Sequence, residues 1–115
     1  MTKTIQIEHQ ENRDVDILRI GGELNIHSAY ILEQSILNLM EKGRYKYVVN
    51  FENIEKLASA GLGMFMARIE EIREANGDIK FSNLSKKVYH VFDLLDFPTL
   101  YDIFDEEEEA VSAFR

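Results

Sequence analysis

Residues 45–75 read YKYVVNFENIEKLASAGLGMFMARIEEIREA, and this stretch decides the fold. Residues 45–51 are rich in aromatic and β-branched side chains with a continuous apolar centre, which is typical of a buried central strand. Apolar residues then recur every three or four positions, which predicts a helix over residues 61–75. The apolar stripe of this helix consists of Leu62, Phe65, Met66, Ile69 and Ile72. A strand, a short turn and an amphipathic helix in succession indicate an α/β fold.

The sequence before this stretch predicts two strands and a helix. Residues 4–8 and 15–20 alternate polar and apolar side chains around a polar turn at 10–14, and we expect Gly21 and Gly22 to end the second strand. Residues 23–26 are expected to be a short extended piece. Ser28 is then expected to cap a helix that runs to Glu41.

The sequence after residue 75 predicts one more strand and two helices. Residues 79–81 form the strand, and Ser85 is expected to cap a third helix. Acidic residues at 105–109 predict the start of a last helix that runs to about residue 114. We therefore expect a single α/β domain over residues 1–115, with a mixed sheet of four or five strands and helices mainly on one face. The expected core comprises Val48, Val49, Phe51, Leu62, Phe65, Ile69, Ile72, Val88 and Phe92.

Composition excludes several classes of function. The chain has 115 residues, no cysteine and a net charge of −8. Disulfides and cysteine-based metal sites are therefore excluded, and the acidic balance argues against nucleic-acid binding. No apolar run approaches the length of a signal peptide core or a membrane helix, so we expect a cytoplasmic protein without membrane contact.

Catalytic and cofactor motifs are also missing from the sequence. It has no glycine-rich loop of a phosphate-binding type. The histidines His9, His27 and His90 lie in three different expected elements, without a partner at metal-ligand spacing. We therefore expect no metal, no cofactor and no enzymatic activity.

The turn from Ala58 to Gly63, ASAGLG, is the most distinctive local feature. It lies between the central strand and the second helix, where Ser59 is placed at or next to the helix N-cap. Because helix N-termini accommodate anions, the fold would tolerate a phosphate on Ser59. Taken alone, the local pattern favours a serine that only caps a helix.

The chain resembles STAS domains, in particular the anti-sigma factor antagonists of bacteria. The resemblance rests on Gly22-Glu23-Leu24-Asn25, on the Ala58–Gly63 turn, and on residues 83–88 and 91–94. In that family, the antagonist binds an anti-sigma factor that is also a serine kinase, which releases the sigma factor. The kinase phosphorylates the turn serine, here Ser59, to eject the antagonist, and a phosphatase resets the cycle.

The resemblance also implies a partner-binding surface around the turn and the second helix. Its expected residues are Asn25, His27, Ser28, Ala58, Ala60, Gly61, Leu62, Met64, Ala67 and Arg68. The family has aspartate at the positions of Ala58 and Asn25. Their replacement leaves two alternatives: altered recognition by the kinase, or a constitutive binder that has lost the switch.

Two further hypotheses stay open from the sequence. The chain is either a STAS scaffold that self-associates, with Ser59 only a cap, or a small-ligand or nucleotide-binding sensor. Under the leading hypothesis we expect a monomer or weak dimer that gains mass only with its kinase partner.

Overall fold

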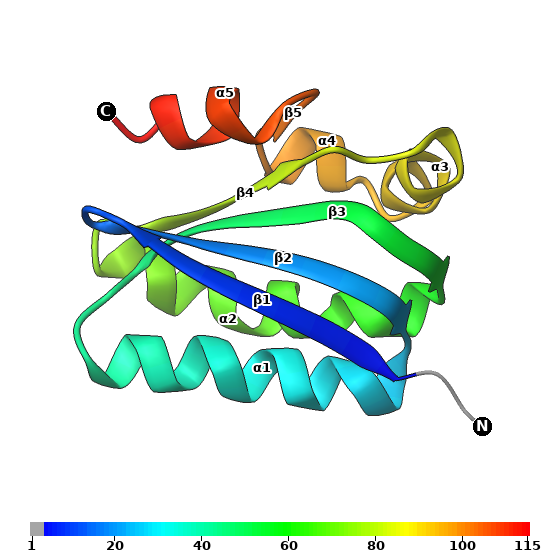
Figure 1. Cartoon of the computed structure of the whole chain (residues 1–115), viewed down its shortest axis with the longest axis horizontal. Coiled ribbons are helices and arrows are strands. Elements are labelled where there is room, and N and C mark those ends of the chain that lie inside the picture. Colours follow the sequence, from blue (N-terminus) through cyan, green and yellow to red (C-terminus); the bar gives the residue numbers. More distant parts are fainter. Residues whose placement is uncertain (1–3) are drawn as a thin grey trace.

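Five strands form one mixed sheet in chain order in the computed structural model, which describes residues 4–115 (Figure 1). The strands are β1 (Ile5–Asn12), β2 (Val15–Leu24), β3 (Lys46–Leu57), β4 (Asp78–Ser82) and β5 (Ile103–Phe104). β1 pairs with β2 in antiparallel fashion, whereas the β2–β3, β3–β4 and β4–β5 pairs are parallel. The expected mixed sheet is confirmed, with five strands.

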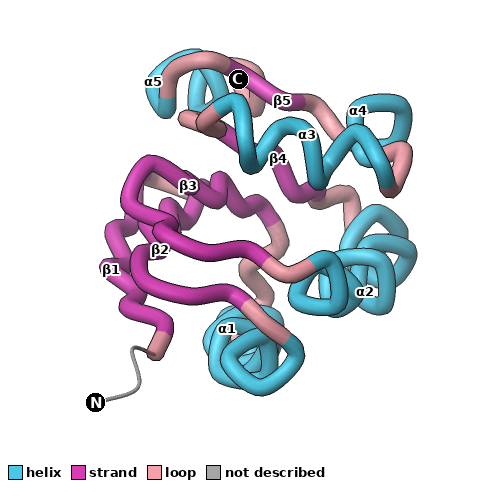
Figure 2. Tube along the Cα trace, turned by 90° about the vertical axis from the view of Figure 1, so that its right-hand side faces the viewer, coloured by secondary structure: helices cyan, strands magenta, loops and turns pink. Residues whose placement is uncertain are grey.

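The helices lie mainly on one face of this sheet. They are α1 (Ile26–Glu41), α2 (Gly63–Glu74), α3 (Lys86–Leu94), α4 (Phe97–Leu100) and α5 (Glu107–Ser112), and a 3-10 turn, η1 (Ser59–Leu62), precedes α2. Figure 2 shows the curved sheet with α1 and α2 on one side and α5 on the other. The prediction of a mainly one-sided arrangement is confirmed, and α5 is the exception.

The burial of β3 on both faces explains its continuous apolar centre. Tyr47, Val49 and Phe51 point into the main core with α1 to α4, whereas Val48 packs in the smaller cluster with Ala110 and Val111 of α5. In the main core, Phe51, Phe81 and Phe92 pack edge to face, with ring centroids 5.0–5.9 Å apart. Of the nine expected core residues, eight are buried, and Ile69 is partly buried against the same core.

The two strands that carry the site are longer than the sequence pattern indicates. β2 does not end at Gly21 and Gly22 but continues to Leu24, because Gly22 adopts φ +80°. A Cβ at position 22 would lie 2.2 Å from the Thr4 carbonyl oxygen, so only glycine fits there. β3 continues past Phe51 to Leu57 and pairs with this extended part of β2, which brings the ends of both strands to the turn that precedes α2.

The remaining differences concern helix starts and short elements. α1 begins at Ile26 with Asn25 as its N-cap, rather than after a Ser28 cap, and α2 begins at Gly63 rather than Gly61. Ser85 does cap α3, because its hydroxyl accepts from the Val88 amide at 3.2 Å. α5 is shorter than expected, and neither α4 nor the short strand β5 follows from the sequence pattern.

Candidate functional site

The turn at Ser59 is held directly against the end of β2. The Ala58 amide donates to the Leu24 carbonyl at 2.9 Å, and the Gly61 amide donates to the Ala58 carbonyl at 2.8 Å. A Cβ on Gly61 would lie 2.9 Å from the Leu24 carbonyl oxygen, which is closer than side chains pack. The glycine therefore lets the turn approach β2, and this contact fixes the position of Ser59.

Ser59 itself is exposed and is the first residue of the 3-10 turn. The N-cap position belongs to Ala58, and no side-chain hydrogen bond caps η1 or α2. Ser59 is thus adjacent to the cap and does not act as one, because the chain enters the helix through a tighter turn. Its hydroxyl makes no hydrogen bond within residues 4–115, which leaves it accessible for modification.

Asn25 and Ser28, both expected to contact a partner, form a capping box at the start of α1. The Asn25 Oδ1 accepts from the amides of His27 and Ser28, each at 2.9 Å. The Ser28 hydroxyl accepts from the Asn25 amide at 2.9 Å and donates to the Glu23 carbonyl at 2.7 Å. Ser28 is buried and Asn25 is half-buried, so these side chains mainly fix the helix start beside the turn.

The other expected contact residues divide between the surface and the interior. His27, Ala58, Ala60 and Ala67 are exposed, and half-buried Arg68 binds Glu33 of α1 at 2.9 Å. The expectation that Met64 lies on the exposed side of α2 is wrong, because Met64 is buried, and Gly61 and Leu62 are buried as well. Met66, expected in the buried stripe of α2, faces solvent instead with 51% exposure.

An exposed apolar patch that sequence reasoning missed lies beside this turn. It consists of Ile26, Tyr30 and Ile31 of α1, with Met66 in the first turn of α2, and these side chains are 47–64% exposed. α1 packs directly against η1, so the helix that carries three of these side chains adjoins the Ser59 turn. The one-turn spacing of Ile26 and Tyr30, outside the buried stripe of α1, is the signal that could have indicated it.

Away from the Ser59 turn, a cluster of polar side chains links helix α5 to the sheet. On the α5 side of the sheet, Arg19 donates to both carboxylate oxygens of Glu107 at 2.8 and 2.9 Å, and Asn50 donates to Glu107 at 2.9 Å. The Arg19 hydrogen bond is the main reason that the pKa of Glu107 is lowered. This pairing attaches α5 to β2 and β3.

Within residues 4–115, no cluster of three or more histidine and acidic side chains is arranged to hold a metal ion. The same part of the chain contains no helix with the length and apolar character needed to cross a membrane. His9 contacts buried Asp16 at 2.7 Å, and His27 and His90 are exposed on α1 and α3.

Comparison with known proteins agrees with this geometry. The STAS domain family matches residues 6–110. The anti-sigma-B factor antagonist of Bacillus subtilis (strain 168) is 26% identical over 111 residues, covering 96% of this chain and 99% of that protein. The solved structure of the anti-sigma factor antagonist SpoIIAA in its unphosphorylated form is 25% identical with a TM-score of 0.80, covering 96% of this chain and 95% of that one. The phosphorylated form of SpoIIAA, a Bacillus cell fate determinant, is 25% identical with a TM-score of 0.73, covering 97% and 100%.

Proposed function

Because the chain belongs to the STAS domain family, we propose that it is an anti-sigma factor antagonist whose binding is switched off by phosphorylation of Ser59. The observation that carries the proposal is the exposed Ser59, whose hydroxyl has no hydrogen bond within residues 4–115. The likeness to antagonists over nearly the whole chain supports the same function.

The proposed partner is an anti-sigma factor that is also a serine kinase. It contacts the exposed residues His27, Ala58, Ser59 and Ala60, together with the apolar patch of Ile26, Tyr30, Ile31 and Met66. Aromatic and methionine side chains that are solvated in the free protein gain the most from burial at an interface. The patch therefore supplies the affinity, and Ser59 supplies the control.

Phosphorylation of Ser59 acts on the interface rather than on the fold. A phosphate adds about −1.5 to −2 charges at neutral pH. Because Ser59 is exposed and its side chain supports no other contact, the added charge leaves the core and the capping box intact. At an interface formed with the apolar patch, burial of that charge without a counter-ion costs several kcal/mol, which is more than a hundredfold in affinity.

The two departures from the family pattern do not disturb the architecture of this site. Asn25 provides the capping hydrogen bonds of α1 with its side-chain oxygen, as an aspartate would. Ala58 is exposed and contributes its backbone to the turn. We propose that the kinase recognises the turn through its shape and the patch, without the two missing carboxylates.

This proposal describes a regulatory binding protein rather than an enzyme. It acts in the cytoplasm with the transcription machinery, as a monomer or weak dimer, and a phosphatase removes the phosphate from Ser59. Gel filtration with and without the kinase partner separates this function from that of a self-associating scaffold. A monomer that gains mass only with the partner supports the antagonist.

A binding measurement tests the proposed surface. The candidate anti-sigma factor kinase is titrated with the wild type, Tyr30→Ala and Leu100→Ala in isothermal titration calorimetry with Mg²⁺ and ADP. Tyr30 and Leu100 are both exposed apolar side chains, on α1 and α4 respectively. Tyr30→Ala is expected to weaken binding at least about tenfold, as an interface anchor does, with no change for Leu100→Ala. Equal affinities for all three proteins would reject the surface, and no binding by the wild type to any candidate kinase would reject the function.

A further inference from the structure

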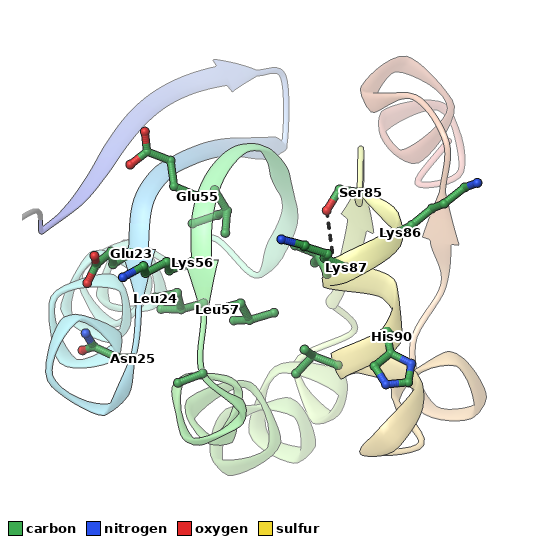
Figure 3. Close-up of a pocket in the computed structure, with 14 residues that line it drawn as sticks. Glu23, Leu24, Asn25, Glu55, Lys56, Leu57, Ser85, Lys86, Lys87 and His90 are labelled. Carbon is green, nitrogen blue, oxygen red and sulfur yellow. Dashed lines mark hydrogen bonds between the residues drawn. The ribbon is translucent and has the colours of Figure 1, made fainter.

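A pocket of about 920 Å³ lies between the ends of β2 and β3 and the helix α3 (Figure 3). Its apolar lining comes from Leu24, Ile54 and Leu57 on the strands and from Val88 and Val91 on α3. All five side chains are aliphatic, and the imidazole of His90 is the one aromatic ring in the lining. The pocket therefore offers mainly an alkyl-binding surface.

Unpaired lysines line this pocket, although the net charge of the chain is −8. They are Lys56, Lys86 and Lys87, and Glu23 and Glu55 also belong to the lining. None of the three lysines forms an ion pair or hydrogen bond within residues 4–115. In contrast, Arg19, Arg44, Lys46, Arg68, Arg73 and Lys80 are all paired with acids.

One of these lysines faces the apolar lining. In Figure 3, Lys87 extends from α3 toward β3, across the opening, whereas Lys86 points away from the pocket and Lys56 extends from β3 away from α3, toward Glu23. Lys86 and Lys87 also occupy the first turn of α3, where no acidic residue is present. Cations at that end of a helix are unfavourable on their own, and an anion bound nearby offsets the repulsion.

We propose that this pocket binds a small amphiphilic anion, with an aliphatic chain against the apolar lining and a carboxylate or phosphate head beside Lys87. The pocket volume lies within the range of about 300–1,000 Å³ that is usual for small-ligand sites. The aliphatic lining selects the chain, and unpaired Lys87 selects the acidic head.

The pocket is adjacent to the Ser59 turn, although the proposal does not rest on the function of that turn. Leu57 and Ala58 line the pocket and lead directly into Ser59, and the Ala58 amide is bonded to Leu24, another lining residue. A bound ligand would therefore contact the strand ends that position the turn.

Decanoate and decyl phosphate, each below its micelle concentration, and decanol, below its solubility limit, serve as probes in ¹⁵N-resolved NMR titrations of the full chain. We expect saturable shifts of the amides of Leu57, Ala58 and Val88 with decanoate, decyl phosphate or both, and affinity for decanol at least about tenfold weaker. The better of the two anions identifies the preferred head group. Absence of saturable shifts with both anions, or equal affinity for decanol, would overturn the proposal.

Charge and shape variants provide the second test. Lys87→Gln is expected to bind the preferred anion about tenfold more weakly, and Val91→Phe, which takes up part of the space for the chain, is expected to weaken binding as well. Lys42→Gln is the matched control, because Lys42 is an exposed lysine at the C-terminal end of α1 and does not line the pocket. Unchanged affinity in Lys87→Gln, or an equal loss in Lys42→Gln, would contradict the proposed head-group site.

Discussion

Replacement of Gly61 by alanine tests the contact that positions the Ser59 turn. An added Cβ would lie 2.9 Å from the Leu24 carbonyl oxygen and 3.0 Å from the Leu24 Cγ. Ordinary van der Waals contact begins at 3.4 Å, so the turn and the end of β2 must separate by at least 0.5 Å. The Leu24 carbonyl is held in the sheet and the Leu24 side chain is buried in the core, so the turn is the part that moves.

The expected loss of stability in Gly61→Ala combines two unfavourable contributions to the free energy of unfolding and one favourable contribution. Overpacking of this size costs about 1–3 kcal/mol, and displacement of the turn weakens the hydrogen bond from Ala58 to Leu24, which contributes about 1 kcal/mol. Alanine restricts the unfolded chain and so returns about 0.5–1 kcal/mol. We therefore expect Gly61→Ala to lower the free energy of unfolding by about 1.5–3 kcal/mol.

Gly63→Ala is the matched control, because it adds the same methyl group two residues away, where no atom lies close to it. Gly63 has helical dihedral angles of φ −60° and ψ −30°, and a Cβ there would meet nothing within 4 Å. It is expected to raise the free energy of unfolding by about 0.5–1 kcal/mol. Urea unfolding followed by circular dichroism measures both variants. If Gly61→Ala were as stable as Gly63→Ala, the close approach of the turn to β2 would be refuted.

Two further predictions concern the capping box and the α5 ion pair. Asn25→Ala should lower the free energy of unfolding by about 1 kcal/mol in urea unfolding, whereas exposed His27→Ala should change it by less than about 0.5 kcal/mol; equal effects would contradict the capping role. The pKa of Glu107 is lowered below 4.5 in the folded protein. Its ion pair with Arg19 therefore stabilises the fold fully above pH 4.5, and this stabilisation is lost as the pH falls through the lowered pKa of the folded protein. The stability difference between the wild type and Glu107→Gln, measured by urea unfolding, should therefore shrink on acidification from about pH 6.5 to about pH 3.5, and a constant difference would contradict the assignment.

The elements that were predicted correctly from the sequence are those whose pattern of apolar side chains reflects burial in the core. The apolar centre of β3 and the stripe of α2 are visible because a core on each side demands such residues. The extension of β3 to Leu57 was not predictable from periodicity, since Glu52, Asn53, Glu55 and Lys56 are exposed beyond the covered part of the sheet. β5 is too short for any pattern, and it is defined by its pairing with β4.

The sharp turn at the candidate site was predicted from the sequence, and the exposure of the residues around it only in part. The small residues of the Ala58–Gly63 turn indicated a sharp connection, and Gly61 is indeed required by its approach to Leu24. In α2, Phe65 and Ile72 were correctly assigned to the core, whereas Met64 and Met66 were exchanged. These two residues flank Phe65 at equal angles on a helix, so periodicity does not decide between them. The pocket beside α3 could not be predicted, because it depends on the distance between α3 and the strand ends.

The measurement that tests the central claim most directly is the intact mass of the protein after incubation with its anti-sigma factor kinase, ATP and Mg²⁺. We predict the gain of one phosphate on the wild type and on Ser112→Ala, which removes an exposed serine of α5, and none on Ser59→Ala. The phosphorylated protein should no longer bind the kinase, while its free energy of unfolding, measured in urea, stays within about 0.5 kcal/mol of that of the unmodified protein. A phosphate on Ser59→Ala, or phosphorylated protein that still binds with unchanged affinity, would contradict the Ser59 switch.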